Sequence, residues 1–312
     1  MVNVKTCILE KFEVHILGCG AALPTPHHFC SMQVVNVREK LFMIDCAEGA
    51  QMQLRKGHLK FSHINNIFLT HLHGDHCFGL IGLISTFALL GRTATLHVYG
   101  PVDLKATFQP QLDYFCNGMD YDVELHEIDT KQRNIIYDDR SVTVETIPLK
   151  HKIKCCGYLF REKPLLPHIK RDAIDAFNIP ISQINNIKCG MDWTTPDGEV
   201  IPNHLLTTPA EPARSFAYCS DTMFKPDNAE QLKGVDLLYH EATFAESHKV
   251  TAKKTFHSTA TEAAEMAKLV EAKQLLIGHL SARYTDENIL LNEAKTVFPN
   301  TTLANEGMCI SI

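Results

Sequence analysis

The chain has 312 residues, of which 45% are apolar and 21% charged, with 16 Gly and 14 Pro. This balance is that of an ordinary globular protein and excludes disordered, collagen-like and low-complexity classes. Thirty basic residues face 36 acidic ones, so the formal net charge is −6. The field of the whole molecule therefore repels a polyanion, and binding of a nucleic acid must come from a local patch.

Several features predict a cytoplasmic protein. The longest uncharged run, Cys77 to Leu90, is shorter than the roughly 20 apolar residues that cross a bilayer, so we expect a buried helix there. The N-terminal segment carries Lys5, Glu10, Lys11 and Glu13, where a secretory signal would need an unbroken apolar core. The 11 cysteines are an odd, scattered set, which indicates buried thiols in a reducing compartment.

Hydrophobic periodicity predicts an α/β protein. Apolar runs rich in β-branched and aromatic residues predict strands over 12–17, 41–44, 67–70, 96–99, 142–147, 158–160, 215–219, 237–239 and 274–277. Helical periodicity predicts helices over 48–56, 77–90, 103–115, 261–271 and 286–297. Strands outnumber helices, so we expect mixed sheets covered by helices.

One stretch has a different composition. From about Arg161 to Pro212 the chain is rich in proline and has few long apolar runs, which predicts an insertion or arm. Between Arg161 and Gly190, five basic residues face three acidic ones, a net charge of +2 that is opposite in sign to the whole chain. The alternative is a solvated surface excursion whose charge has no function.

The densest group of potential ligands is the segment 71–76, His-Leu-His-Gly-Asp-His, which directly follows a predicted strand. Imidazole and carboxylate ligands suit zinc and similar cations, and α/β sheets place ligand sites at the carboxyl ends of their strands. Spacing lets His71 and His73 point the same way, whereas Asp75 and His76 fall in the next turn. The segment therefore predicts two metal positions, with Gly74 permitting a sharp turn.

Three further candidates each follow a predicted strand: His151, Asp221 and His279. A single His or Asp at a strand end is otherwise a cap or a satisfied polar group. Together with the segment 71–76, they complete two coordination sets.

His257 precedes a predicted helix in which Thr259 and Glu262 have capping-box spacing. The start of a helix attracts a phosphate, and a histidine there is able to give a proton to a leaving oxygen. The alternative is that Thr259 merely caps the helix and His257 has no role.

The ligand pattern HxHxDH, with later His, Asp and His residues, resembles the metallo-β-lactamase superfamily. Five further segments are similar to the ribonuclease Z family of tRNA 3′-processing endonucleases. They are 17–24 (LGCGAALP), 44–49 (IDCAEG), 240–243 (HEAT), 257–259 (HST) and 278–284 (GHLSARY). The resemblance starts at about Lys11, and the HEAT and HST segments favour RNA processing because they are not general to the superfamily.

The resemblance implies an αββα sandwich of two mixed β-sheets flanked by helices. It implies one metallo-β-lactamase domain over residues 1–312, with an inserted tRNA-binding arm over 161–200, and a homodimer. It also implies two zinc ions per subunit, with Mn²⁺ or another divalent metal as the alternative. One zinc would be held by His71, His73 and His151, and the other by Asp75, His76 and His279, with Asp221 bridging them.

The resemblance assigns roles to further residues. Asp75 would orient or deprotonate water, and Glu241 would orient His257, which would protonate the leaving oxygen. Substrate phosphate would be bound by Arg283 and Ser281, and Asp45 would orient a ligand histidine. The arm would contact tRNA through Lys163, Lys170, Arg171 and Lys188. The loop 24–31 departs from the family pattern because it lacks the basic residue and the Asn that members often carry there.

The expected reaction is hydrolysis of precursor tRNA just 3′ of the discriminator nucleotide, which leaves a 3′-OH on the tRNA and a 5′-phosphate on the trailer. One alternative is a hydrolase of small phosphodiesters or other esters, since one metal centre serves many substrates. Another is a tRNA-binding module that has lost catalysis.

Overall fold

The computed structural model describes residues 10–312, and Lys5 of the N-terminal segment lies outside the described residues. The chain forms two compact units. The larger unit comprises the chain up to Arg161 together with Arg214–Ile312, and the smaller unit is Glu162–Ala213. Among the described residues, no helix is long and apolar enough to cross a membrane.

The first sheet of the larger unit has seven strands in the order β18-β1-β2-β3-β4-β5-β6. They are β1 (Phe12–Gly18), β2 (Met32–Val37), β3 (Lys40–Ile44), β4 (Ile64–Phe68), β5 (Leu96–Pro101), β6 (Val123–Ile128) and β18 (Cys309–Ser311). Strands β3 to β6 run parallel, and β18, β1, β2 and β3 pair antiparallel. The carboxyl ends of β3 and β4 therefore meet at one edge of the sheet.

The second sheet also has seven strands, in the order β17-β16-β15-β14-β9-β8-β7. They are β7 (Ile135–Asp138), β8 (Val142–Pro148), β9 (Cys156–Glu162), β14 (Ser215–Cys219), β15 (Leu237–Glu241), β16 (Gln274–Gly278) and β17 (Thr301–Leu303). Strands β14 to β17 run parallel, so the segments after β14, β15 and β16 leave the sheet at the same edge.

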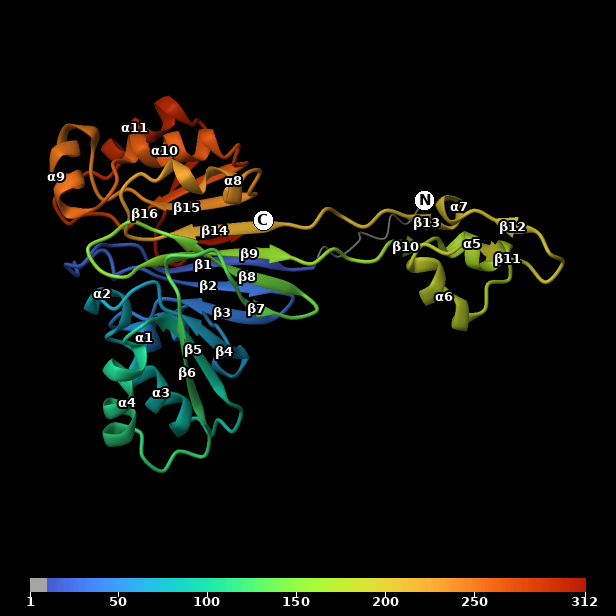
Figure 1. The fold of residues 1–312 in the computed structure, drawn as a ribbon, viewed down its shortest axis with the longest axis horizontal. Helices are drawn as coiled ribbons and strands as arrows, with labels where there is room; N and C mark the ends of the chain where they lie inside the picture. Colours follow the sequence, from blue (N-terminus) through green and yellow to red (C-terminus); the bar gives the residue numbers. More distant parts are fainter. Residues whose placement is uncertain (1–9) are drawn as a thin grey trace. The chain divides into compact units, whose positions relative to one another are not determined.

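Helices and 3₁₀ turns connect the strands of the larger unit. They are α1 (Ala50–Lys56), α2 (Gly74–Cys77), α3 (Leu80–Leu89), α4 (Leu104–Phe115), α8 (Ala229–Leu232), α9 (Lys249–Thr255), α10 (Ala260–Leu269), α11 (Asn288–Val297) and the 3₁₀ turns η1 (Phe61–His63), η2 (Pro226–Asn228) and η3 (Glu246–His248). Figure 1 shows α1, α3 and α4 outside the first sheet, and α10 and α11 outside the second. The predicted αββα sandwich is confirmed.

The core between the sheets is rich in aromatic rings. Phe42 and Phe68 of the first sheet pack against Phe160 of the second, with ring centroids 5.8 and 5.9 Å apart. A second apolar cluster lies between the first sheet and its helices, and includes Leu54, Ile84 and Phe108. Burial on both faces explains why these strands appear as continuous apolar runs in the sequence.

The helix predicted over 77–90 is present as α3, but it begins at Leu80, because Cys77 ends the separate short helix α2. The N–H of Gly79 donates to the carbonyl of Cys46 at 2.9 Å. A Cβ atom at Gly79 would lie 2.0 Å from the carbonyl oxygen of Ala47, so only glycine permits this close approach. The segment that follows β3 therefore separates the two helices. The buried strand β2 was not predicted, since Gln33 and Asn36 interrupt its apolar run.

The smaller unit has its own core and its own short strands. Its elements are β10 (His168–Ile169), α5 (Arg171–Ala176), α6 (Ile181–Lys188), β11 (Trp193–Thr194), β12 (Val200–Ile201), α7 (Asn203–Leu206) and β13 (Thr207–Thr208). Apolar side chains of α5, α6 and α7, including Ala173, Ile187 and Leu206, are buried together. The unit extends past the predicted end at residue 200 because β13 pairs with β10.

The charge of the smaller unit depends on where it ends. Residues 162–213 contain four basic and seven acidic residues, a net charge of −3, because Asp192, Asp197, Glu199 and Glu211 follow the basic part. The positive surplus found between Arg161 and Gly190 therefore does not extend to the whole unit. Electrostatic attraction to RNA would have to come from the part of the unit that precedes residue 190.

Candidate active site

Four predicted ligands converge in the larger unit. His71 lies just after β4, His73 just before α2, His151 after β8 and Asp221 after β14. Nδ1 of His73 lies 2.9 Å from Nε2 of His71 and 3.3 Å from Nε2 of His151. Oδ2 of Asp221 lies 3.7 and 3.8 Å from the Nε2 atoms of His71 and His151. We call these four residues the first ligand group.

The second ligand group comprises Asp75, His76, Asp221 and His279. Oδ1 of Asp221 lies 3.4 Å from Nε2 of His76 and 3.1 Å from Nε2 of His279. Oδ2 of Asp75 lies 3.2 and 3.8 Å from the same two nitrogens. Asp221 thus presents one oxygen to each group, and the two groups contain the same residues as the two predicted sets.

The chemistry of both groups fits bound divalent cations. The Nε2 atoms of His76 and His279 are buried without a hydrogen-bond partner among the described residues. Burial opposes the charge of Asp221, yet His279, His76 and His71 hold its pKa well below the usual value. Burial and the neighbouring imidazoles lower the pKa of His71, which keeps its ring neutral. Imidazole nitrogens around a shared carboxylate suit ions of the zinc class.

A buried carboxylate of the first sheet orients two of these histidines. Asp45 directly follows β3 and accepts hydrogen bonds from the N–H of Thr70 at 2.8 Å and from its hydroxyl at 3.0 Å. The Thr70 hydroxyl also lies 3.0 Å from Nδ1 of His71, and Asp45 lies 2.8 Å from Nδ1 of His76. Contacts at Nδ1 leave Nε2 of both rings directed at the ligand groups.

A second buried carboxylate, Glu241 at the end of β15, has the corresponding place in the other sheet. It accepts hydrogen bonds from the N–H groups of Thr222, Thr243 and Ser258, each at 3.0 Å. The Thr243 hydroxyl donates to it at 2.7 Å and lies 2.8 Å from Nδ1 of His279. Three backbone donors fix this carboxylate, and through Thr243 it orients the His279 ring.

His257 is the second histidine held by Glu241, with Nδ1 2.9 Å from the carboxylate. Burial opposes its charge, but Glu241, with Asp221 and Asp75, raises the pKa of His257 to about 9. Its ring lies 5.3 Å from the ring of His279 and 5.1 Å from that of His151, between centroids. A histidine outside both ligand groups therefore lies beside them in a surrounding that favours its protonated form.

The segment that carries His257 is fixed by the start of α10. The predicted capping box is confirmed: Thr259 Oγ1 accepts the N–H of Glu262 at 3.2 Å, and Glu262 accepts the N–H of Thr259 at 3.0 Å. The Thr259 hydroxyl also donates to Glu246 at 2.7 Å. Two carboxylates therefore lie at this helix start, which disfavours the phosphate that the sequence led us to expect there.

Gly74 has a different role from the predicted one. It has no positive φ, so it does not make a turn that only glycine permits. A Cβ atom at this position would lie 2.3 Å from the ring of Phe78. The glycine leaves room for the ring of Phe78, which is itself exposed.

The predicted phosphate-binding residues lie in the loop after His279. The guanidinium of Arg283 is exposed and lies 5.2 Å from the centroid of the Phe244 ring. Phe244 in turn lies 6.1 Å from the ring of His257. Ser281 Oγ accepts the N–H of Arg283 at 3.4 Å. The structure thus brings Arg283 to the side of the site where His257 lies.

The four basic residues predicted to contact tRNA all lie in the smaller unit. Lys170 donates to the carbonyl of Leu205 at 2.9 Å, and Arg171 pairs with Asp175 at 3.3 Å. Lys188 ends α6, and Lys163 is half-buried with a partner inside the described chain. Arg171 is the most exposed of the four cations.

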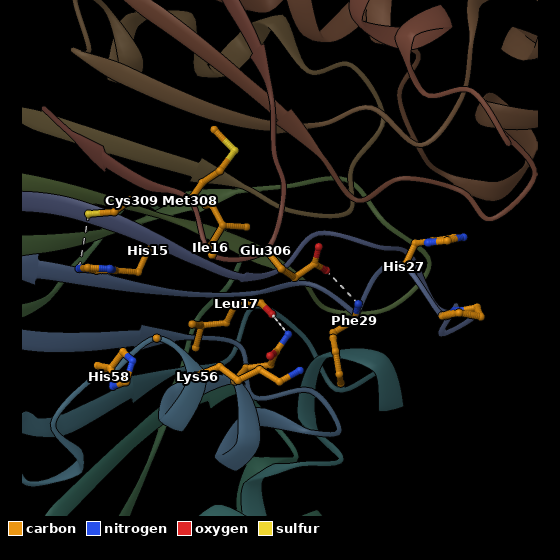
Figure 2. Close-up of a pocket in the computed structure, with 14 residues that line it drawn as sticks. His15, Ile16, Leu17, His27, Phe29, Lys56, His58, Glu306, Met308 and Cys309 are labelled. Carbon is orange, nitrogen blue, oxygen red and sulfur yellow. Dashed lines mark hydrogen bonds between the residues drawn. The ribbon is translucent and has the colours of Figure 1, made fainter.

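A cavity of about 580 Å³ lies away from both ligand groups, since none of their residues line it. It is bordered by the end of β1, the loop at Pro26–Phe29, the end of α1 and the segment 306–309 (Figure 2). Glu306 accepts the N–H of Phe29 at 2.9 Å, and His28 pairs with Glu306 and Glu287 at 2.8 Å each. These contacts fasten the atypical loop 24–31 to the C-terminal part of the chain.

Comparison with known proteins agrees with this geometry. The family described as Anti-Pycsar protein Apyc1 matches residues 12–162, and the Beta-lactamase superfamily domain matches residues 205–280. The short form of human tRNase Z has a TM-score of 0.70 at 26% identity, covering 96% of this chain and 99% of that one. The metallo-beta-lactamase fold protein YhfI from Bacillus subtilis has a TM-score of 0.68 at 19% identity, covering 97% and 100%. Fold and ligand groups together define a metallo-β-lactamase-fold protein.

Curated relatives narrow this class. Ribonuclease Z of Bacteroides thetaiotaomicron is 61% identical over 304 residues, which cover 97% of this chain and 96% of the relative. Ribonuclease Z of Porphyromonas gingivalis is 54% identical, covering 97% and 100%. The chain belongs to the ribonuclease Z family, and it is a hydrolytic endoribonuclease.

Proposed function

We propose that this protein removes the 3′ trailer from precursor tRNA by hydrolysis after the discriminator nucleotide. The products are a tRNA with a 3′-OH and a trailer with a 5′-phosphate. The observation that carries this proposal is the Glu241–His257 pair, which lies beside two ligand groups in a chain 61% identical to a ribonuclease Z. A hydrolase of simple esters needs the ligand groups, but this pair adds a proton donor for a poor leaving group such as a ribose oxygen.

The two ligand groups would each hold a divalent ion, zinc or alternatively manganese, with Asp221 shared between them. When bound, such a pair of ions stabilises the charge that develops on the phosphoryl group and increases the acidity of a water molecule. Asp45 and Glu241 hold the ligand rings in place for this through Thr70 and Thr243.

Asp75 and His257 take the two protein roles in the chemical step. Burial opposes the charge of Asp75, but the nearby imidazoles of His279 and His76 lower its pKa. The ionised carboxylate would accept a hydrogen bond from the attacking water and orient it. The water oxygen forms a bond to phosphorus, one of its protons passes to solvent, and the bond from phosphorus to O3′ breaks. His257 donates its proton to O3′, which leaves as the 3′-OH of the tRNA.

Substrate binding would involve two regions. Arg283, with Ser281, would bind a phosphate oxygen beside the bond that breaks, since its guanidinium is exposed near Phe244 and His257. The arm would contact tRNA through Lys163, Lys170, Arg171 and Lys188. Because the whole unit carries a net charge of −3, these contacts are expected to be few and local.

The decisive experiment incubates the purified protein with a 3′-extended precursor tRNA, with and without a chelator, and maps both product ends at nucleotide resolution. A single chelator-sensitive cut after the discriminator, leaving a 3′-OH, is expected. Hydrolysis of bis(p-nitrophenyl) phosphate without any cut in the tRNA would favour the small-diester hydrolase. Binding of the precursor without any cut, in a metal-replete sample, would favour a tRNA-binding module.

Two further parts of the proposal concern the state of the protein in the cell. We expect a homodimer, which sedimentation equilibrium of the purified protein would test. We also expect a cytoplasmic location, where precursor tRNA is available, and fractionation of cells would test it.

A further inference from the structure

A second kind of histidine cluster lies on the first sheet, at its β6 edge. His97 lies on β5, and Glu124 and His126 lie on β6. Nδ1 of His97 is 3.1 Å from Nε2 of His126, and Oε2 of Glu124 is 3.2 and 3.5 Å from these nitrogens. Tetrahedral zinc with bonds of roughly 2.0–2.1 Å places its ligand atoms about 3.3 Å apart. The three atoms therefore have the spacing of three corners of a zinc tetrahedron.

The backbone and an aromatic stack hold this arrangement in place. In the parallel register, His97 is level with Glu124, and Tyr99 is level with Phe68 on one side and His126 on the other. The Tyr99 ring stacks on Phe68 at 4.9 Å and on His126 at 4.6 Å. The His126 ring is thus oriented by the core of the sandwich, which lowers the entropy cost of binding an ion.

Hydrogen bonds within the cluster leave like groups facing each other. If both neutral imidazoles direct an N–H at Glu124, two donor nitrogens lie 3.1 Å apart, and if only one does, the other nitrogen turns its lone pair toward the carboxylate. Protonation of both rings would place two positive charges 3.1 Å apart. Burial and His97 lower the pKa of His126, although Glu124 opposes this, so the neutral ring is favoured. One cation is able to accept all three lone pairs at once.

Two other clusters of possible ligands are less suitable. In the group of Cys19, His28 and Glu306, burial and Glu306 raise the pKa of Cys19, which keeps its thiol protonated, and Glu306 already accepts the N–H of Phe29. In the group of Glu13, His15 and Cys309, the His15 nitrogen lies 3.6 and 3.9 Å from its neighbours. The cluster on β5 and β6 has shorter and more even spacing.

We propose that His97, Glu124 and His126 bind an additional divalent transition-metal ion of the zinc class, which fastens the edge strand β6 to β5. All three side chains are partly exposed, with exposed fractions of 34%, 54% and 36%, so solvent supplies the remaining coordination position. His97 is level with Asn66 on β4, five residues before His71, which corresponds to about 16 Å along the strand. The site is therefore separate from both ligand groups and independent of the proposed function.

Zinc stoichiometry tests this site. The full chain, the double variant His97→Gln/His126→Gln and the control His63→Gln are each dialysed to equilibrium against zinc, and bound metal is counted per chain. His63 is a matched control because it lines the same cavity as His97. Its Nδ1 lies 3.1 Å from the carbonyl of Glu39, which is not part of the proposed metal site. The double variant is expected to bind one zinc fewer than the wild type and the control, and to cleave RNA within about 2-fold of the wild-type rate.

Equal zinc numbers in all three proteins would overturn the proposal, as would loss of one zinc from the control as well, since that indicates unspecific binding by surface histidines. Circular dichroism shows whether the double variant is folded. If it is not, Glu124→Gln replaces it, because this exposed side chain has no role in the core. Glu124→Gln is expected to weaken zinc binding at one position by about 10-fold, and unchanged binding would contradict the assignment.

Discussion

The two halves of the larger unit contain the same hydrogen-bonded arrangement with different outcomes. In the first half, Asp45 bonds to Thr70, which orients His71. In the second half, Glu241 bonds to Thr243, which orients His279. Each chain of contacts runs from a buried carboxylate through a hydroxyl to an imidazole, and each leaves Nε2 directed at Asp221 or its neighbours.

The difference lies in the second histidine that each carboxylate holds. Asp45 holds His76, which is fully buried and belongs to the second ligand group. Glu241 holds His257, whose side chain is 14% exposed and which belongs to neither group. Under the proposed function, the enclosed carboxylate–histidine pair provides a metal ligand, and the pair with the partly exposed histidine provides the proton donor.

The largest effect on cleavage is expected at Asp221, which belongs to both ligand groups. Asp221→Ala removes an oxygen from both ligand groups at once, so cleavage of precursor tRNA should fall by at least about 10³-fold, more than the roughly 10–100-fold typical of outer residues. Bound metal, counted by mass spectrometry, should fall as well. Full metal content with lost cleavage would show that Asp221 acts on the substrate and does not bridge the groups.

The next prediction separates the two histidine pairs. His257→Ala should lower the rate of cleavage about 10²-fold or more without loss of metal, because the ring gives a proton and binds no ion. His76→Ala should lower metal content. Single-turnover cleavage and metal analysis of both variants test this, and near-normal cleavage by His257→Ala would remove it as the proton donor.

The threonines offer a closer comparison. Thr70→Val and Thr243→Val keep the side-chain shape and remove the hydroxyl that connects carboxylate to imidazole. Each change should lower metal affinity or cleavage about 10-fold or more. Thr243→Val should also alter cleavage by the metal-saturated protein, since Glu241 positions His257 too. Equal behaviour of both variants at saturating metal would contradict the division of roles.

The arm should affect binding without affecting the chemical step. Arg171→Ala and Lys188→Ala together are expected to raise KM for precursor tRNA several-fold at unchanged kcat and to reduce the salt dependence of binding, since each removes about one phosphate contact. Asp192→Asn in the same unit is the matched control and should leave the salt dependence nearly unchanged. A fall in kcat would show that the arm acts on the site.

The smallest effect on cleavage is expected for a carboxylate that holds no histidine. Asp139 accepts the N–H groups of Ser141 and Val142 and pairs with Lys40. Burial opposes its charge, but Lys40 and these N–H groups lower the pKa of Asp139 to about 2. Asp139→Asn should cost about 1–2 kcal/mol of unfolding free energy and leave cleavage unchanged.

The pH dependence of Asp139 follows from its lowered pKa. The stabilisation that the Asp139 carboxylate provides is fully present above its pKa in the unfolded chain, about 4, and is lost as the pH falls toward 2. Urea unfolding of wild type and variant should therefore converge at low pH. If the free energies of unfolding of wild type and variant differ by the same amount at every pH, the charge of Asp139 does not contribute to stability.

The sequence predicted the ligand residues of the site, but not the hydrogen bonds that orient them. The ligands follow strands with strong apolar runs, and parallel strands bring their carboxyl ends together, so distant residues such as His71 and His279 were expected to meet. The roles of Thr70 and Thr243 were not expected. Thr243 lies inside the HEAT segment and Thr70 ends the predicted strand 67–70, but a threonine near a histidine has no pattern that reveals which carboxylate it will contact.

Differences between the predicted and observed element boundaries have a similar cause. The break between α2 and α3 depends on the approach of Gly79 to the segment after β3, which is a tertiary contact. The end of the smaller unit depends on pairing between β10 and β13, two strands of two residues each. Elements so short carry no periodic signal, so their boundaries become visible only in three dimensions.

The pairing of β18 with β1 has a consequence for synthesis of the chain. In this pair Glu13 is level with Ser311, roughly 300 residues later. At about 5–20 residues per second, β1 waits about 15–60 s on the ribosome before its outer neighbour is made. During that time the growing chain presents an open strand edge, which invites pairing with other chains. One edge of β1 therefore stays unpaired until almost the whole chain has been synthesised.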